Sequence, residues 1–182
     1  MFVDHTTETA PDAARRTMAA TEKRLGYLPA AVARLATAPQ LLDGFLKLSG
    51  MFETTSLDPL ARETVIMTMA TRNRCHICVA MHTAKLDQLG ADPALVTALR
   101  EDKPLPDTRL AALRTFTITV LETAGGVPDE ALDAFVSAGF TAQQALEVVL
   151  GIGAYTMSTL ANRLTRAPVD DSLAAYAWSP AT

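Results

Sequence analysis

Both cysteines of the chain and two of its three histidines lie within one short segment, Arg74–His82. If this segment is helical, Cys75, Cys78 and His82 occupy positions i, i+3 and i+7, which lie within about 60° of one another around the helix axis. One helix face then carries two thiols and an imidazole. Such a set of groups is suited to thiol redox chemistry or to metal binding.

The spacing of the two thiols favours redox chemistry. Cysteines at i and i+3 of a helix have Cα atoms about 5–6 Å apart, which is within disulfide range. The thiolate is the reactive form, and two features of the segment can stabilise it. His82 lies one turn after Cys78 and favours Cys78 as the attacking thiol, whereas unpaired N–H groups at the helix start favour Cys75. The residues alone leave both assignments open.

An acidic residue further upstream is out of pattern. Glu63 lies on an otherwise apolar face of the helix expected over residues 58–71. Burial raises the pKa of a carboxyl group towards neutrality, which would allow this side chain to carry a proton. The alternative is a purely structural ion pair with a nearby arginine, namely Arg62, Arg72 or Arg74.

These residues form the pattern Glu-x11-Cys-x2-Cys-x3-His, and over residues 28–164 the sequence resembles the alkylhydroperoxidase D and carboxymuconolactone decarboxylase family. The resemblance implies a thiol-dependent peroxidase or disulfide oxidoreductase that reduces organic hydroperoxides. It implies that Cys78 attacks the peroxide, that Cys75 resolves the intermediate, and that Glu63 and His82 relay protons. A separate thiol or lipoyl-protein reductant would reopen the disulfide. We expect neither a cofactor nor a metal.

The sequence departs from the family pattern at one position. The best-known peroxidases of the family carry a second relay histidine immediately before the second cysteine, where this chain has Ile77. His76 stands one residue earlier, about 100° around the helix. The departure leaves the efficiency of the chain as a peroxidase open, while the redox activity of the cysteine pair is still expected.

Two other functions use the same residues. In a carboxymuconolactone decarboxylase-type enzyme acting on lactones, Glu63 and His82 would do acid and base work, but such chemistry does not require a second thiol. In a non-enzymatic module, the cluster would be a zinc site or a redox sensor. Cys-x2-Cys-x3-His offers three zinc ligands, and only Glu63 or His76 is at hand as a fourth.

The composition sets further limits. A chain of 182 residues is expected to form one domain. A net charge of −4 argues against nucleic-acid and anionic-membrane partners. The first residues lack the features of a secretory signal, and the longest uncharged run, 148–162, is shorter than a membrane span, so we expect a cytoplasmic protein. Its 49% hydrophobic content favours self-association, and the resemblance implies a homo-oligomer: a dimer, trimer or hexamer.

Apolar residues recur at helical spacing and no segment alternates as a strand would. The sequence therefore predicts an all-α, single-domain helical bundle of the alkylhydroperoxidase D-like type with about eight or nine helices. We expect a flexible N-terminal tail over 1–10, the helical domain over 11–168 and a C-terminal tail over 169–182. The expected helices cover residues 11–25, 29–36, 37–52, 58–71, 75–89, 93–100, 107–123, 129–138 and 141–164.

Local signals predict some helix boundaries and contacts. Residues 37–40 and 141–144 both have the capping-box pattern, in which the first and fourth residues satisfy each other's backbone N–H groups. In the last helix, Gly151 and Gly153 each cost about 1 kcal/mol relative to alanine, so we expect another helix to pass close to them. Tyr155 and Asn162 are not assigned to the site, because helix packing explains them equally well.

Overall fold

The computed structural model describes residues 1–180, which form nine α-helices, one 3-10 helix and no β-strand. The α-helices are α1 (Asp12–Leu25), α2 (Ala30–Leu35), α3 (Pro39–Glu53), α4 (Pro59–Arg72), α5 (His76–Gln88), α6 (Pro93–Arg100), α7 (Thr108–Glu122), α8 (Asp129–Ser137) and α9 (Ala142–Thr165). The 3-10 helix η1 (Asp171–Tyr176) follows α9. The predicted all-α, single-domain bundle is confirmed, with each α-helix within about two residues of its predicted bounds.

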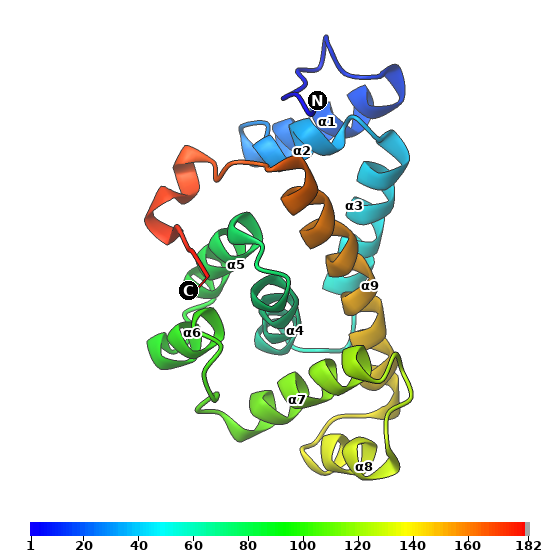
Figure 1. Cartoon of the computed structure of the whole chain (residues 1–182), viewed down its shortest axis with the longest axis vertical. Coiled ribbons are helices and arrows are strands. Elements are labelled where there is room, and N and C mark those ends of the chain that lie inside the picture. The colour runs from blue at the N-terminus through cyan, green and yellow to red at the C-terminus, as the bar shows by residue number, and fades with distance from the viewer. Residues whose placement is uncertain (181–182) are drawn as a thin grey trace.

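Helix α4 lies at the centre of the bundle, where it contacts α3, α5, α6, α7 and α9 (Figure 1). Its N-terminus is well defined, because the Asp58 carboxylate accepts a hydrogen bond from the N–H of Ala61 and Pro59 occupies the first helical position. Almost every side chain from Ala61 to Ala70 is buried. A carboxylate on this helix, such as that of Glu63, is therefore enclosed whichever way it points and needs a partner.

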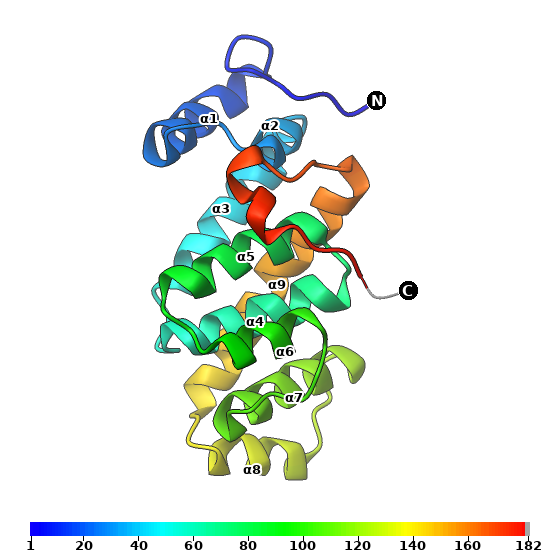
Figure 2. The ribbon, with the colours of Figure 1, turned by 90° about the vertical axis from the view of Figure 1, so that its left-hand side faces the viewer.

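The longest helix, α9, packs along α3 and α4 (Figure 1). Viewed from the side, the molecule is a stack with α1 and α2 at one end and α8 at the other (Figure 2). The main hydrophobic core surrounds α4, and a second cluster, which includes Met18 and Leu42, joins α1, α2 and α3. Because α1 is held through this second cluster, it lies apart from the core around the cysteines.

The two predicted capping boxes have different outcomes. At the start of α9, Thr141 and Gln144 form the reciprocal side-chain and backbone hydrogen bonds of a capping box, as predicted. At the start of α3, the prediction is wrong: the cap residue is Ala38, which makes no side-chain cap, and α3 begins at Pro39. The N–H of Thr37 instead donates to the carbonyl of Arg34, so Thr37 continues the end of α2.

The two glycines of α9 also differ. A Cβ atom at Gly151 would lie 2.7 Å from ring atoms of Phe52 and 3.1 Å from a methyl group of Val65, so α3 and α4 do pass close to it as predicted. At Gly153 the prediction is wrong for the described chain, because nothing lies within 4 Å of the corresponding position. Gly153 faces away from the rest of the bundle.

The segment after α9 crosses α5 and contacts it through η1. The Tyr176 hydroxyl donates to the Asp87 carboxylate at 2.8 Å, and the Trp178 indole N–H donates to the Arg100 carbonyl at 2.9 Å. The predicted tail boundaries at residues 10 and 168 stay predictions. The last two residues of the predicted C-terminal tail, 181–182, lie outside the described residues.

Within residues 1–180, no single helix is long and apolar enough to cross a membrane. Helices α8 and α9 are long and apolar enough only when taken together, and they are bent by 107° relative to each other.

Candidate functional site

The turn between α4 and α5 determines where the cysteines lie. The N–H groups of Arg74 and Cys75 donate to the carbonyls of Thr71 and Ala70, which is the hydrogen-bond pattern of a Schellman motif. Arg74 has a φ of 52°, in the left-handed region that favours glycine. The turn is therefore tight and mildly strained, and α5 begins directly after Cys75.

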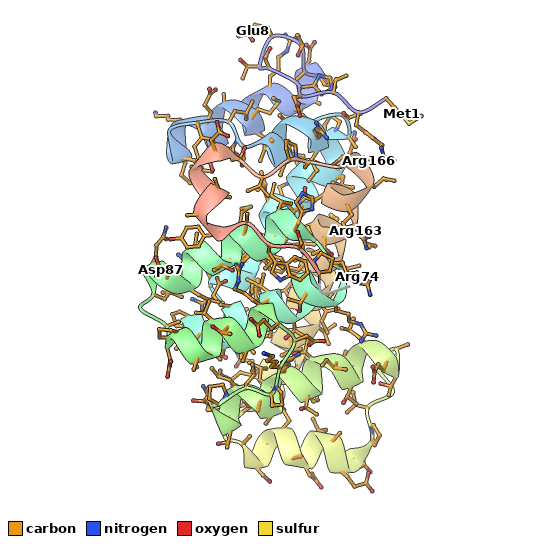
Figure 3. All side chains as sticks on the ribbon, turned by 60° about the vertical axis from the view of Figure 1, so that its left-hand side comes forward. Met1, Glu8, Arg74, Asp87, Arg163 and Arg166 are labelled. Atoms are coloured by element: carbon orange, nitrogen blue, oxygen red, sulfur yellow. The ribbon has the colours of Figure 1, made fainter. Side chains whose placement is uncertain are left out.

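Helix α9 holds this turn from the other side. A guanidinium N–H of Arg163 donates to the carbonyl of Asn73 at 2.9 Å, and the Asn73 amide donates to the Thr159 hydroxyl at 2.8 Å. Arg163 and Arg74 project at the same edge of the bundle, opposite Asp87 (Figure 3). The site is thus assembled from α4, α5 and α9.

Cys75 and Cys78 are free thiols enclosed by protein, with exposed fractions of 0% and 3%. Their Sγ atoms are 2.7 Å apart, with Cys75 as the hydrogen-bond donor. Asn162 of α9 donates from Nδ2 to Cys78 Sγ at 3.4 Å, and Ser158 Oγ lies 3.9 Å from the same sulfur. Polar contacts from two helices therefore converge on Cys78 Sγ.

These contacts separate the two thiols in acidity. The hydrogen bond from Cys75 lowers the pKa of Cys78 below that of an ordinary thiol, and the Asn162 amide and the charge of His82 act in the same direction, against the effect of burial. The pKa of Cys75 is raised, because its thiol donates to Cys78 and because burial disfavours its thiolate. The geometry favours a thiolate at Cys78 and a neutral thiol at Cys75.

Glu63 and His82 form a second buried pair. Glu63 Oε2 lies 2.7 Å from His82 Nδ1, and the two side chains are 3% and 14% exposed. Burial lowers the pKa of His82, but the Glu63 carboxylate raises it, and the net pKa is above the ordinary value for histidine. The His82 ring also makes an edge contact with Tyr155, with ring centroids 5.4 Å apart.

The structural alternative for Glu63 was an ion pair with an arginine. Arg62 instead lies 3.9 Å from the Glu53 carboxylate, and Arg72 lies 3.4 Å from that of Glu122. Glu63 directs its carboxylate to His82.

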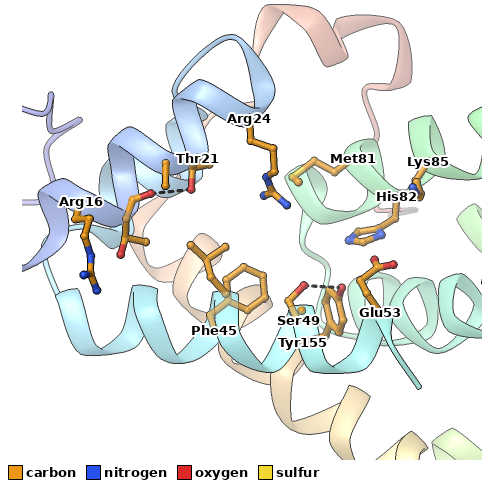
Figure 4. A pocket seen from close by; sticks show the side chains of 14 residues that line it. Arg16, Thr21, Arg24, Phe45, Ser49, Glu53, Met81, His82, Lys85 and Tyr155 are labelled. Carbon is orange, nitrogen blue, oxygen red and sulfur yellow. Dashed lines mark hydrogen bonds between the residues drawn. The ribbon is translucent and has the colours of Figure 1, made fainter. Parts of the chain in front are cut away.

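A cavity of about 860 Å³ lies beside His82, between α1, α3, α5 and α9 (Figure 4). His82, Tyr155 and Ser49 belong to its lining, and the Tyr155 hydroxyl is 3.3 Å from Ser49 Oγ. Within the described chain, neither Cys75 nor Cys78 is among the lining residues. The cavity thus reaches the imidazole, whereas the thiols lie behind it.

The four predicted site residues come together as two pairs, Cys75 with Cys78 and Glu63 with His82. The hydrogen bond of His82 goes to Glu63, so its influence on Cys78 is exerted through charge. His76 is not part of this group, because its Nε2 lies 3.1 Å from the carbonyl oxygen of Ala167.

Sequence reasoning did not assign two residues that contact Cys78, namely Ser158 and Asn162. Both are buried polar residues, one turn apart on α9. A polar side chain on a buried helix face is the signal that singled out Glu63, and it would have found this pair. Asn162 Oδ1 is itself buried and makes no hydrogen bond within residues 1–180.

Among the residues that the structure describes, no three His, Cys, Asp or Glu side chains are grouped so that they could hold a metal ion. The two residues considered as a fourth zinc ligand, His76 and Glu63, contact the Ala167 carbonyl and His82 respectively.

Residues 39–103 match the carboxymuconolactone decarboxylase family. This segment runs from α3 to α6 and contains Glu63, Cys75, Cys78 and His82. A comparison with curated proteins finds no match to the sequence.

Solved structures share the fold over nearly the whole chain. The alkylhydroperoxidase AhpD core of an uncharacterised peroxidase-related protein from Ralstonia eutropha JMP134 superposes with a TM-score of 0.81 at 19% identity, covering 94% of this chain and 93% of that one. A peroxidase-related protein from Silicibacter sp. TM1040 gives a TM-score of 0.75 at 20% identity, with coverages of 94% and 92%. A cysteine-to-alanine variant of the debrominase Bmp8, in complex with 2,3,4-tribromopyrrole, gives a TM-score of 0.72 at 14% identity, with coverages of 97% and 95%.

The chain therefore has the alkylhydroperoxidase D-like fold, and the resemblance to the alkylhydroperoxidase D and carboxymuconolactone decarboxylase family is confirmed. The similar structures include peroxidase-related proteins and a debrominase, so the fold alone does not select one chemistry. The chemistry of this chain depends on the residues of its site.

Proposed function

We propose that this protein is a thiol-dependent peroxidase and disulfide oxidoreductase that reduces organic hydroperoxides. The observation that carries the proposal is the environment of Cys78 Sγ, which receives hydrogen bonds from Cys75 and Asn162 and lies 2.7 Å from the sulfur of Cys75. A sulfur whose pKa is lowered is a ready nucleophile, and a neighbouring thiol at this distance can trap its oxidised form.

The proposed cycle has two steps. The Cys78 thiolate attacks the terminal oxygen of the hydroperoxide and forms a sulfenic acid, while the O–O bond breaks and the departing alkoxide takes a proton to become an alcohol. The Cys75 thiol then condenses with the sulfenic acid, which releases water and forms the disulfide. The two thiols lose two electrons in total, and the hydroperoxide gains them.

The Glu63–His82 pair supplies the proton in this proposal. Because its pKa is raised, His82 remains protonated to a higher pH than an ordinary histidine and can donate to the departing alkoxide. A dithiol such as a lipoyl protein, or another thiol, would reduce the disulfide and restore the two protons and two electrons.

Access to the sulfur requires a side-chain movement. The cavity ends at His82 and Tyr155, and Cys78 is only 3% exposed. A peroxide in the cavity reaches Cys78 after one of these rings rotates.

The test is the intact mass and free-thiol count of the reduced, metal-free protein, followed over seconds after adding one equivalent of cumene hydroperoxide. We expect both thiols to disappear with a mass decrease of two hydrogens. Cys75→Ser should instead trap a sulfenic acid on Cys78, detectable with dimedone. Thiols that survive this treatment in the wild-type protein would rule the peroxidase function out.

One observation favours a second candidate, a proton-transfer enzyme of the carboxymuconolactone decarboxylase type. His82 lines the cavity and is paired with Glu63, as an acid–base pair would be, while the thiols lie behind it. Under this alternative, a variant with both Cys75→Ser and Cys78→Ser would retain turnover of a lactone substrate, whereas His82→Gln would abolish it.

A further inference from the structure

We propose that the cavity beside His82 selects hydroperoxides that carry a carboxylate, and that Arg24 of α1 binds that carboxylate. This inference rests on the proposed peroxidase function and names its substrate class. It follows from the charge, the apolar surface and the orientation of the side chains around the cavity.

The charged residues of the lining are Arg16, Arg24, Lys85 and Glu53, which sum to +2. Glu53 lies 3.9 Å from Arg62, which offsets its charge. The whole chain carries −4, so the positive lining is not a consequence of a basic protein. A hollow whose lining carries a net positive charge concentrates anionic ligands.

The three cationic side chains have no acidic partner of their own. Within residues 1–180, Arg16, Arg24 and Lys85 appear in no ion pair and no side-chain hydrogen bond, although Arg15 on the same helix pairs with Asp12. Arginine presents a planar set of donors that matches a carboxylate. These groups are therefore available to an anionic ligand.

The orientation of Arg24 places its charge inside the cavity. Figure 4 shows its side chain extending from α1 towards Met81 of α5, with His82 at one end of the cavity and Arg16 towards the other. Arg16 and Arg24, just over two turns apart on α1, both line the hollow. A ligand with its peroxide at His82 can extend its carboxylate to Arg24.

The rest of the lining suits the hydrocarbon part of such a molecule. Phe45 and Leu46 of α3, Met81 of α5 and Tyr155 of α9 provide apolar surface. The volume of about 860 Å³ falls in the range of roughly 300–1,000 Å³ that holds ligands of drug size. An apolar acid with a hydroperoxide group distant from its carboxylate matches the positive charge of the cavity, its apolar surface and the separate positions of Arg24 and His82.

The test compares two peroxides of nearly the same size, 4-carboxycumene hydroperoxide and its methyl ester. The second-order rate constant for oxidation of the reduced wild-type protein is measured for each by stopped-flow and thiol counting. We expect the carboxylate to react about tenfold faster than the ester, with a ratio that falls as salt is added. Equal rate constants would overturn the inference.

Arg24→Gln provides the mutational test, with Lys23→Gln as its control. Both changes remove one positive charge from exposed positions of α1, but Lys23 is not among the lining residues. We expect Arg24→Gln to reduce the ratio of the two rate constants to about 2 or less, and Arg24→Lys to restore part of it. Lys23→Gln should leave the ratio unchanged. An equal effect of the two glutamine variants would show that only net charge matters and would refute the role of Arg24.

An unreactive analogue separates failure of this inference from failure of the peroxidase proposal. Binding of 4-isopropylbenzoate is measured by calorimetry with the wild-type protein and with Arg24→Gln. If neither peroxide oxidises the thiols but this acid binds and Arg24→Gln abolishes binding, the anion site stands and the peroxidase function is rejected. If the peroxides react equally and the acid does not bind, the peroxidase function stands and the carboxylate site is rejected.

Discussion

The environment of Cys78 includes a residue outside the cysteine motif. Asn162 donates to Cys78 Sγ at 3.4 Å, and a hydrogen bond to a charged group contributes about 1.5–3 kcal/mol, or roughly one to two pKa units. Asn162→Leu keeps the approximate volume and removes the donor. We expect the Cys78 thiol pKa to rise by about one unit, measured from the pH dependence of alkylation by iodoacetamide in a Cys75→Ser background.

Ser158→Ala serves as the graded comparison, because Ser158 Oγ lies farther from the sulfur, at 3.9 Å. Ser158→Ala should also raise the pKa of the Cys78 thiol, but by less than Asn162→Leu does. If the alkylation profile of Asn162→Leu coincides with that of the parent, Asn162 has a packing role only.

The Glu63–His82 pair gives a prediction about pH. Glu63→Gln removes the carboxylate that raises the pKa of His82, and burial then lowers that pKa. His82 then loses its proton at a lower pH. In the pH profile of the rate of thiol oxidation by cumene hydroperoxide, the high-pH limb should therefore move to lower pH. Loss of the positive charge also raises the pKa of Cys78, so the low-pH limb should move up. We expect a narrower pH profile, measured by stopped-flow.

Glu122→Gln, which alters a surface carboxylate paired with Arg72, is the control and should leave both limbs in place. A Glu63→Gln profile with its high-pH limb unmoved would remove Glu63 from the proton relay.

At the residue scale, the site residues that could be predicted are those that lie close together in the sequence or interrupt an apolar helix face. Cys75, Cys78 and His82 share eight consecutive positions, and Glu63 is an acid on an apolar face. Asn162 lies 84 residues from Cys78, and only the folded chain, in which both α5 and α9 pack on α4, brings the two side chains together. The cationic lining was not predicted for the same reason, since α1 approaches α5 only in the folded chain.

At the scale of the helices, boundaries were predictable where local chemistry decides them. Asp58 and Pro59 begin α4, and Thr141 with Gln144 caps α9, as predicted. The prediction failed at residues 37–40 because two local signals compete there. Proline is best placed at the first helical position, and α3 follows Pro39 rather than the capping-box pattern.

Gly151 of α9 provides a test of helix packing. An added Cβ would lie 2.7 Å from the ring of Phe52, which is fully buried. Overpacking typically costs about 1–3 kcal/mol, more than the roughly 1 kcal/mol that alanine gains in helix propensity. We expect Gly151→Ala to lower the free energy of unfolding by up to about 2 kcal/mol, measured by urea denaturation.

Gly44→Ala in α3 is the matched control, because nothing lies within 4 Å of a Cβ at that position. It should raise the free energy of unfolding by up to about 1 kcal/mol. A stabilised Gly151→Ala would mean that α3 and α9 are not in contact at this point.

At the scale of the whole molecule, α9 presents an apolar stripe to the outside. Leu146, Val149, Leu160 and Leu164 fall within about 60° of one another around the helix, and their exposed fractions range from 49% to 73%. Gly153 lies in the same stripe and has open space beside it. A glycine within an exposed apolar helix face allows another helix to approach closely, so the partner expected there is absent from a single chain.

We propose that a second copy of this chain covers the stripe, in line with the expected homo-oligomer. Leu160→Glu places a charge within the stripe and should reduce the oligomer to the monomer, measured by size-exclusion chromatography with light scattering. Leu132→Glu, at an exposed apolar position of α8 outside the stripe, should leave the molar mass unchanged. A wild-type protein that is already monomeric at micromolar concentration would refute the proposal. If Leu160→Glu is monomeric and still forms the Cys75–Cys78 disulfide at the wild-type rate, one chain contains the complete redox site.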